Sequence, residues 1–425
     1  MAAESVDTTA PPSIRAATLW RHPDFLKLWS AQTISVFGDN FTALALPLIA
    51  AITLNATPGQ MGILTALERL PFLVLGLMAG VWVDRTRRRP ILIAGDVGRG
   101  LVLLTIPAAA LAGELGMPQL YVVGLLVGVL TLFFDVAYQA YLPSLVARGQ
   151  LVEGNSKLEA TRSVAALAGP GLAGAIIQRL TAPLAIILDG VSFFLSAGLL
   201  GTIRAREVPP ARAEGRSMTA EVREGLGVVF GSPYLRSIAA CTGVSNLFAA
   251  ALFTLYILFA TRDLGLNAAA IGLIFSVGNA AALAGALFAG RLGVRLGVGP
   301  VIVGSAVVFS IAPLPIVVAQ RATAFPLLVL SQLLFSFCSP VYNINQVSLR
   351  QAITPLRLQG RMNATMRFLV WGTMPIGGLL AGALGDALGL RPAIAISALG
   401  GMTSFLWVLF SPVRRLQSIP EYRDE

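Results

Sequence analysis

The fold is decided by the stretch GVWVDRTRRRP at residues 80–90, where four arginines and one aspartate stand between two long apolar runs. Charges at this density are too costly for the hydrocarbon of a bilayer, and the flanking runs are too apolar and too long for a soluble surface. Short loops rich in Lys and Arg remain on the cytoplasmic side of a membrane. The stretch therefore predicts a short cytoplasmic loop between two membrane-spanning helices.

The composition of the whole chain also indicates a polytopic membrane protein. Of its 425 residues, 56% are hydrophobic and only 12% are charged, whereas a soluble domain carries about a quarter charged residues. The net charge of +10 comes from arginines scattered among loops, so we expect no nucleic-acid partner. The single histidine, His22, and the two cysteines, Cys241 and Cys338, have no metal-ligand or disulfide spacing. We therefore expect neither a metal site nor a cofactor.

Twelve segments of the chain are long and apolar enough to be membrane spans of roughly 20 residues. They are predicted at 25–54, 59–84, 90–113, 117–146, 153–180, 182–203, 232–261, 267–292, 298–320, 323–352, 358–385 and 390–412. Residues 1–24 lack an apolar core and are predicted to form an N-terminal tail rather than a cleaved signal.

The distribution of positive charge predicts the orientation of these spans. With twelve spans, only Arg179, Arg262, Arg321 and Arg391 fall on the side opposite the 80–90 loop, and most other arginines and lysines fall on its side. Because positive loops stay inside, both termini are predicted to be cytoplasmic. The expected location is the inner membrane of a cell, with the chain passing through it many times.

A polar connection at 204–231 divides the chain into two halves of similar length. We predict an N-terminal lobe of six helices at 25–203, a cytoplasmic linker at 204–231 with a short amphipathic helix, and a second six-helix lobe at 232–412. Residues 413–425 are then a C-terminal tail. The predicted fold class is an all-α membrane protein with two lobes.

The two halves also resemble each other in sequence. Residues 79–85 with Pro90 can be aligned with residues 289–295 with Pro300, and a second pairing aligns residues 162–170 with 367–375. Weak repeats of this kind are typical of transporters that bind their substrate between two lobes. The alternative is a chance likeness between helices rich in Ala and Gly.

The loop at 80–90 matches a signature of the major facilitator superfamily, Gly-x-x-x-Asp-Arg-x-x-Arg followed by Arg or Lys. The chain resembles this superfamily over nearly its whole length. Within it, the chain is most similar to a bacterial exporter branch that includes macrolide efflux and enterobactin export proteins. Three stretches carry that closer resemblance. They are residues 37–39, residues 141–146 and residues 351–363.

The resemblance implies a latch on the cytoplasmic side. In the superfamily, the residue corresponding to Asp84 caps the helix that begins here near Leu358 when this side is closed, and Gly80 permits close approach of a neighbouring helix. Arg85 and Arg88 would connect the loop to acidic partners within the N-terminal lobe. The alternative is that these charges serve only to orient the chain.

Three ionisable residues are expected near the middle of the membrane: Asp39 in the first span, and Glu68 and Arg69 in the second. Such residues are costly and usually mark a transport pathway. Poor hydration there favours a protonated carboxyl group, which makes Asp39 the first candidate for proton coupling and Glu68 the second. The alternative is that either carboxylate forms a buried ion pair with Arg69.

A second set of ionisable residues is expected nearer the cytoplasm. It comprises Asp96 and Arg99, Asp135, and Glu159 and Arg162. The first and last pairs are spaced i, i+3 and therefore share one face of a helix. We interpret this set as an inner gate rather than as substrate ligands.

Gly169, Pro170 and Gly174 lie in a stretch that resembles the antiporter motif of the superfamily, Gly-x-x-x-Gly-Pro-x-x-Gly-Gly. Two of its glycines are replaced here, by Ala165 and Ala173. In the family this motif accompanies exporters that exchange substrate for protons. A plain helix-packing surface is the alternative, because small residues permit close contact.

The second lobe is nearly free of charge at membrane depth. Its candidate cavity residues are Asn246, Asn279, Tyr342, Asn343 and Arg367. A wall of amide and aromatic side chains suits an amphipathic compound, and Arg367 has no evident acidic partner.

Together these features predict a proton-coupled exporter of a lipophilic or amphipathic small molecule, such as a drug, a macrolide or a siderophore-like compound. Its partners would be the substrate, protons and the lipid bilayer, and we expect a monomer. An importer of a small metabolite is the main alternative. A membrane-embedded enzyme is less favoured, because the chain has no nucleophile–base set and no phosphate-binding motif.

Overall fold

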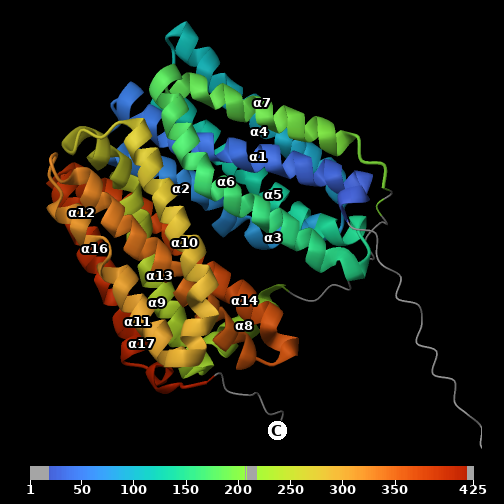
Figure 1. Ribbon diagram of the computed structural model, residues 1–425, viewed down its shortest axis with the longest axis vertical. Coiled ribbons are helices and arrows are strands. Elements are labelled where there is room, and N and C mark those ends of the chain that lie inside the picture. The colour runs from blue at the N-terminus through green and yellow to red at the C-terminus, as the bar shows by residue number, and fades with distance from the viewer. Residues whose placement is uncertain (1–18, 206, 208–217, 419–425) are drawn as a thin grey trace, which may run out of the picture.

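The computed structural model describes residues 19–205, 207 and 218–418. Its described residues form helices and connecting turns, without any strand. The helices pack into two bundles that meet at one end and diverge toward the other, where α8 and α14 lie (Figure 1). We call the diverging end the tail side and the opposite end the far side.

The N-terminal lobe contains α1 to α7, and α8 follows in the linker region. Their bounds are α1 Pro23–Leu48, α2 Pro58–Val74, α3 Gly76–Asp84, α4 Arg88–Ala112, α5 Met117–Leu145, α6 Leu151–Leu180, α7 Ala182–Gly201 and α8 Met218–Gly231. The C-terminal lobe comprises α9 Pro233–Leu258, α10 Ala268–Leu296, α11 Val298–Ile311, α12 Leu314–Val318, α13 Ala324–Ala352, α14 Leu356–Trp371, α15 Thr373–Leu388, α16 Leu390–Met402 and α17 Leu406–Leu409.

Eleven helical stretches within the described residues are long and apolar enough to cross a membrane. The prediction of twelve spans is therefore not confirmed in number, and the difference lies at 59–84. That segment is divided at Leu75 into α2, of 17 residues, and α3, of 9 residues. Each helix alone is shorter than the roughly 20 residues that a span needs.

Local sequence explains where the helices begin. Thr57 and Gln60 form a reciprocal capping box at the start of α2, and Pro58 occupies its first turn. At the start of α9, the Ser232 hydroxyl accepts from the Leu235 backbone N–H, and Pro233 occupies the first turn. These signals start helices directly at the membrane boundary, where backbone N–H groups would otherwise lack partners.

The two lobes repeat the same pattern of helices. Helices α1 and α9 both have 26 residues, and each continues into a π-helical segment of 5 residues, Ile49–Thr53 and Phe259–Asp263. Helices α5 and α13 both have 29 residues. The chain therefore folds as two lobes related by pseudo-symmetry.

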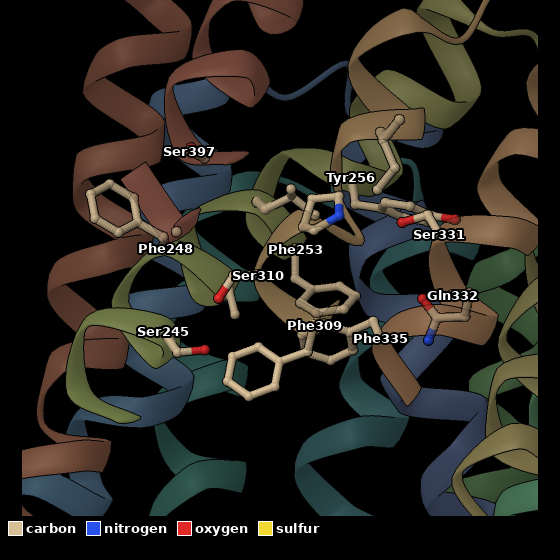
Figure 2. A pocket seen from close by; sticks show the side chains of 15 residues that line it. Ser245, Phe248, Phe253, Tyr256, Phe309, Ser310, Ser331, Gln332, Phe335 and Ser397 are labelled. Carbon is tan, nitrogen blue, oxygen red and sulfur yellow. The ribbon is translucent and has the colours of Figure 1, made fainter. Parts of the chain in front are cut away.

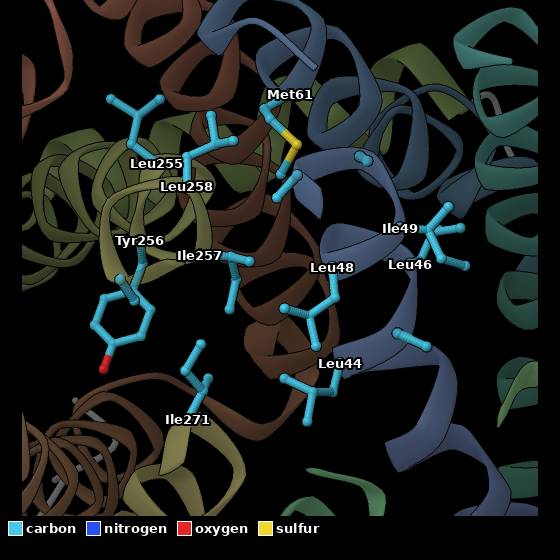
Figure 3. Close-up of a cluster of buried hydrophobic side chains, with 14 of the residues drawn as sticks. Leu44, Leu46, Leu48, Ile49, Met61, Leu255, Tyr256, Ile257, Leu258 and Ile271 are labelled. Atoms are coloured by element: carbon cyan, nitrogen blue, oxygen red, sulfur yellow. The ribbon is translucent and has the colours of Figure 1, made fainter. Parts of the chain in front are cut away.

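The far side is closed by an apolar cluster to which both lobes contribute. Figure 3 shows part of it, with Leu44, Leu48 and Met61 from the N-terminal lobe facing Ile257 and Ile271 from the C-terminal lobe. All five side chains are at least 95% buried. Apolar burial of this kind excludes water and stabilises the contact between the lobes.

Backbone contacts at glycines bring the lobes still closer on the far side. A Cβ atom on Gly62 of α2 would collide with the carbonyl oxygen of Gly378 in α15, and one on Gly174 of α6 would collide with that of Ala268 in α10. Polar contacts add to the closure, since the Asn279 side chain donates to the Ala166 carbonyl oxygen at 2.5 Å. The far side is therefore sealed.

The tail side has no such common core. The N-terminal lobe buries one apolar cluster, which includes Leu28, Val83 and Leu142, and the C-terminal lobe buries a separate one, which includes Ile238 and Met362. Helix α8 packs against α14 and α9 of the second lobe. The structure is thus closed on the far side and open between the lobes on the tail side.

Candidate functional site

A buried arginine organises the polar interior of the N-terminal lobe. Arg99 of α4 is 2% exposed, and its guanidinium lies between the rings of Phe134 and Phe193, 4.3 and 4.1 Å from their centroids. Its Nη2 donates to Asp96 Oδ1 at 2.5 Å, and its Nη1 lies 3.8 Å from Asp39 Oδ1. The two aromatic faces and two carboxylates together hold the positive charge in place.

A third carboxylate, Asp189 of α7, lies in the same interior and is fully buried. Its oxygens accept hydrogen bonds from the hydroxyl of Thr42 and from Ser192 Oγ, the latter at 3.2 Å. It also interacts electrostatically with Asp39 and Arg99. The close approach of α1 to α7 here depends on Gly38, since a Cβ atom at that position would overlap Ser192 and Asp189.

We call Asp39, Asp96, Arg99 and Asp189 the Arg99 cluster. It contains three carboxyl groups and one cation, so full ionisation would leave two negative charges without compensation in a poorly hydrated interior. Asp39 differs from the other members, because its side chain is 48% exposed. It also interacts electrostatically with Asp135 and Arg162, which line cavities nearer the tail side. Asp39 thus connects the buried charges to the aqueous space.

The predicted grouping of these residues differs from the observed one. Asp39 was expected to pair with Arg69 if it paired at all, whereas within the described residues its ion pair is with Arg99. Glu68 lies against α5, with its Cγ close to Gly124, and Arg69 is exposed. Asp39, assigned to the membrane centre, and Asp96 and Arg99, assigned to the inner gate, therefore meet in one cluster.

The predicted latch residues lie apart from α14 in this open form. Gly80 has no atom of another helix within 4 Å of an added Cβ position. Arg85 is exposed. The side chain of Asp84 lies outside the described part of the chain, although its backbone ends α3. The Asp84 contact with the start of α14 stays a prediction for the closed form.

Arg88 finds its acidic partner in the linker. Both oxygens of Glu207 accept from the Arg88 backbone N–H at 2.8 Å, and the two side chains form an ion pair of 3.5 Å. Glu207 thus caps the start of α4, where the helix dipole favours an anion. At the other end of the linker region, Glu224 of α8 pairs with Arg361 of α14. The linker region is held to both lobes.

Glu159 and Arg162 form the predicted i, i+3 pair, with side chains 3.6 Å apart that are both more than half exposed. They line a cavity of about 810 Å³ on the N-terminal lobe together with Tyr138 and Gln139. Within the described residues Asp135 forms no ion pair, although it interacts electrostatically with Arg99 and Arg162. It lines a cleft of about 380 Å³ between the lobes, opposite Arg367.

The motif at Gly169, Pro170 and Gly174 lies where helices pack most closely. Gly169 faces Asn40 of α1 in its own lobe, while Pro170 and Gly174 face Gly272 and its neighbours in α10 of the other lobe. The small residues thus form part of the contact between the lobes on the far side, as expected for a helix-packing surface.

The C-terminal lobe contains a cavity of about 600 Å³ that opens toward the tail side. Four of the five residues predicted for this lobe line it, namely Asn246, Tyr342, Asn343 and Arg367. The fifth, Asn279, lies instead at the contact between the lobes, where it bonds to α6. Tyr342 is buried, and its hydroxyl lies 2.9 Å from the Thr242 hydroxyl.

A smaller cavity of about 30 Å³ continues from this one into the lobe (Figure 2). The two share Ser245, Phe309 and Phe335, and Phe253 and Tyr256 extend the aromatic wall. The rings of Phe309 and Phe335 meet edge to face at 6.4 Å, as do those of Phe253 and Phe335 at 6.0 Å. We call this the aromatic cavity.

Two residues of this polar interior were missing from the sequence prediction. Asp189 is the one charged residue of the apolar run 182–203. Ionisable residues inside spans usually mark a functional site, and this rule, which identified Asp39 and Glu68, also applies to Asp189. Arg350 had been assigned only to the orientation of the chain, although it lines the 600 Å³ cavity. Near the end of a span, an arginine is normally a loop residue, so sequence offered no signal for its inward position.

Comparison with known proteins agrees with this architecture. Residues 16–423 match the transmembrane secretion effector family. The chain belongs to this family, within the major facilitator superfamily. It is therefore a multi-pass membrane transporter and not an enzyme. The predicted family and the two-lobed fold are confirmed.

Individual relatives are similar over almost their whole length. The multidrug efflux pump Tap of Mycolicibacterium fortuitum is 27% identical, covering 87% of this chain and 91% of its own. The enterobactin exporter EntS of Salmonella typhi is 24% identical, covering 97% of this chain and 98% of its own. Among solved structures, a bacterial homologue of the iron transporter ferroportin in its inward-facing state has a TM-score of 0.75 at 16% identity, covering 92% and 99% of the two chains.

Proposed function

We propose that this transporter exports a lipophilic or amphipathic small molecule in exchange for protons, by alternating access across a bacterial inner membrane. The observation that carries the proposal is the Arg99 cluster, in which three carboxyl groups share one cation and one of them, Asp39, is exposed. A proton on this cluster would relieve the excess negative charge. The efflux activity named for Tap and EntS supports the direction of transport.

In the proposed cycle, Asp39 is the group that exchanges its proton with the aqueous space. It is the exposed member of the cluster, and its distance of 3.8 Å from Arg99 Nη1 lets its charge state change the balance around that guanidinium. Loss or gain of one charge here would alter the packing of α1 and of α4 against α7, the helices that carry the cluster. The lobes would then rotate against each other, so that the tail side closes and the far side opens.

The expected orientation places the tail side, both termini and the linker in the cytoplasm, in agreement with the positive charge of the tail-side loops. In this orientation, the described form is open to the cytoplasm and could receive a cellular compound for export. The latch at Gly80, Asp84 and Arg85 would act in the opposite form, when the tail side closes.

The test is transport into everted membrane vesicles with an acidic lumen, over a panel of lipophilic compounds. A proton-coupled exporter accumulates its substrate in the lumen and releases it when nigericin collapses the pH gradient. If the gradient and its collapse leave every flux unchanged, proton coupling is wrong. Accumulation in right-side-out vesicles instead, driven by an inward proton gradient, would indicate an importer.

Asp39→Asn should abolish accumulation driven by the pH gradient while the protein is still inserted and folded. The matched control is Glu114→Gln, which removes a carboxylate from an exposed loop on the far side. Both variants are compared at equal amounts in the membrane. Transport by the Asp39 variant at the level of the Glu114 variant would remove Asp39 from the mechanism.

A further inference from the structure

The 600 Å³ cavity of the C-terminal lobe contains two positive charges and no acidic side chain among its lining residues. One of them is Arg367 of α14, which is exposed to the cavity and also lines the cleft between the lobes. Its guanidinium carbon lies 5.6 Å from the centre of the Trp371 ring. Within the described residues, no carboxylate lies within ion-pair distance of Arg367.

The second charge is Arg350, near the end of α13. Its Nη2 donates to Asn363 Oδ1 at 2.9 Å, and its Nη1 donates to Gln346 Oε1 at 3.2 Å. Both partners are neutral amides, and Arg350 Nε is buried without a hydrogen-bond acceptor in the described structure. The side chain is thus oriented by its neighbours, while no carboxylate of the described residues lies within ion-pair distance of its charge.

Among the described residues that line the cleft between the lobes, the one acidic side chain is Asp135, which belongs to the N-terminal lobe. It forms no direct pair with Arg367 in the open structure. Two uses of the free guanidinium groups are therefore possible: closure against Asp135, or recognition of an anion from solution. Only the second involves Arg350, because Asp135 does not line the 600 Å³ cavity.

The aromatic cavity extends from the same space. Its shared residues Ser245, Phe309 and Phe335 link the region of the two arginines to Phe253 and Tyr256 deeper in the lobe (Figure 2). A guanidinium pair next to an aromatic wall suits a molecule with an anionic group and a flat apolar body, because arginine binds carboxylates through two parallel N–H bonds. A cationic molecule would meet uncompensated like charge there.

We infer that the C-terminal lobe binds an amphipathic aromatic anion in the 600 Å³ cavity, with its anionic group at Arg350 and Arg367 and its apolar body against Phe309 and Phe335. The inference rests on the proposed function, since it names the substrate class of that transporter. It assigns ligand recognition to the second lobe, while the proton site lies in the first. The two lobes can therefore be tested separately.

The test uses purified full-length protein in lipid nanodiscs and three fluorescent probes that share one ring system: 1-pyrenebutyrate, its methyl ester and 1-pyrenemethylammonium. Binding is followed by fluorescence anisotropy. We expect the carboxylate to bind at least about tenfold more tightly than the ester, the size expected of hydrogen bonds to a charged group, and the ammonium probe to bind most weakly. Equal affinity for carboxylate and ester would overturn the inference.

Arg367→Gln and Arg350→Gln should each weaken binding of the carboxylate probe by about tenfold. The affinity for the ester should stay unchanged. Arg291→Gln is the matched control, because Arg291 is an exposed arginine of the same lobe, on α10 and outside both cavities. Asp135→Asn tests the alternative that Arg367 pairs with Asp135 when the lobes close. If Arg367 serves only closure, its replacement impairs transport as Asp135→Asn does, but the carboxylate preference remains, which would also overturn the inference.

The outcomes also separate this inference from the proposed function. A carboxylate preference that depends on both arginines, without any flux driven by a pH gradient, would support the site and contradict the proton-coupled exporter. Proton-driven flux of compounds in the absence of any carboxylate preference would leave the exporter standing and overturn the anion site.

Discussion

The two lobes are built alike but differ in charge at the same positions of the repeat. Counted from the first residue of each helix, the members of the Arg99 cluster have uncharged counterparts in the C-terminal lobe. Asp39, Asp96, Arg99 and Asp189 correspond to Ala249, Ala306, Phe309 and Ser397, respectively. Three of these counterparts, Ala249, Phe309 and Ser397, line the aromatic cavity.

The two lobes therefore share one architecture but have different interiors. Where the first lobe places a cation between three carboxylates, the second places aromatic rings and hydroxyl groups around a small empty space. Charges in a low-dielectric interior change their surroundings when a proton binds, whereas an apolar cavity changes little with pH. This difference supports the proposal that protons exchange in one lobe and the ligand binds in the other.

The largest expected effect comes from removing the cation alone. Arg99→Phe copies the C-terminal residue into a site that retains three carboxylates, and breaking a buried ion pair in this way costs about 3–5 kcal/mol. We expect the thermal unfolding midpoint of the protein in detergent to fall sharply, with loss of transport. An unchanged midpoint would contradict the structural role of the cluster.

The matched variant copies the whole C-terminal set into the first lobe, by the quadruple substitution D39A/D96A/R99F/D189S. Because every buried charge is then removed, most of the stability lost in Arg99→Phe should return, while proton-driven transport stays absent. If the quadruple variant is less stable than Arg99→Phe, the charges are not the main difference between the two interiors.

A smaller effect is expected at the closest helix contacts of the two lobes. Gly38 of α1 faces Ser192 of α7, whereas at the corresponding contact Gly400 of α16 faces the ring of Phe248 in α9. The glycine thus lies on the first helix of the contact in the N-terminal lobe and on the second helix in the C-terminal lobe. Gly38→Ala and Gly400→Ala should each cost about 1–3 kcal/mol by overpacking.

Thermal unfolding in detergent measures this effect. The control is Gly198→Ala in α7, where an added Cβ meets no atom within 4 Å. Alanine is the better helix former, so this variant should be neutral or slightly more stable. A loss of stability in Gly198→Ala as large as in Gly38→Ala would mean that the close contact is not the cause.

The smallest effect is expected from an exposed pair with the same spacing as a buried one. Glu159 and Arg162 are spaced i, i+3 like Asp96 and Arg99, but they are 68% and 56% exposed. Exposed pairs of this kind contribute at most about 0.5 kcal/mol. Glu159→Gln should leave the unfolding midpoint within a degree or so, while Asp96→Asn lowers it clearly; equal shifts would show that burial does not set the strength.

Much of the fold could be predicted because membrane insertion leaves few choices. Backbone groups in a bilayer must bond within their own helix, so apolar runs become helices, and caps such as Thr57 and Ser232 set where they begin. The count of spans was less predictable. Pro71 and Gly76 stand beside the break at Leu75, but both residue types are common inside membrane helices, so they did not predict it.

The candidate site was predicted in its residue types but not in its groupings. Asp39, Asp96 and Arg99 were each found from their charge within apolar runs, but the alternative ion pair considered for Asp39 was with Arg69, whereas the observed one is with Arg99. Depth along a helix can be counted from sequence, whereas the partner across the bundle depends on helix rotation. The small residue Gly38 decides that rotation for α1 and α7.

By itself, the sequence determined that this protein is a membrane transporter of two repeated lobes, because hydropathy, positive loops and the signature at 80–90 act locally. Only the tertiary structure decided that three carboxylates share Arg99, that Arg350 and Arg367 line one cavity, and that the far side is the closed one. Those features depend on contacts between helices far apart in the chain. Such contacts are selected by packing and charge balance across the whole bundle, which no single segment encodes.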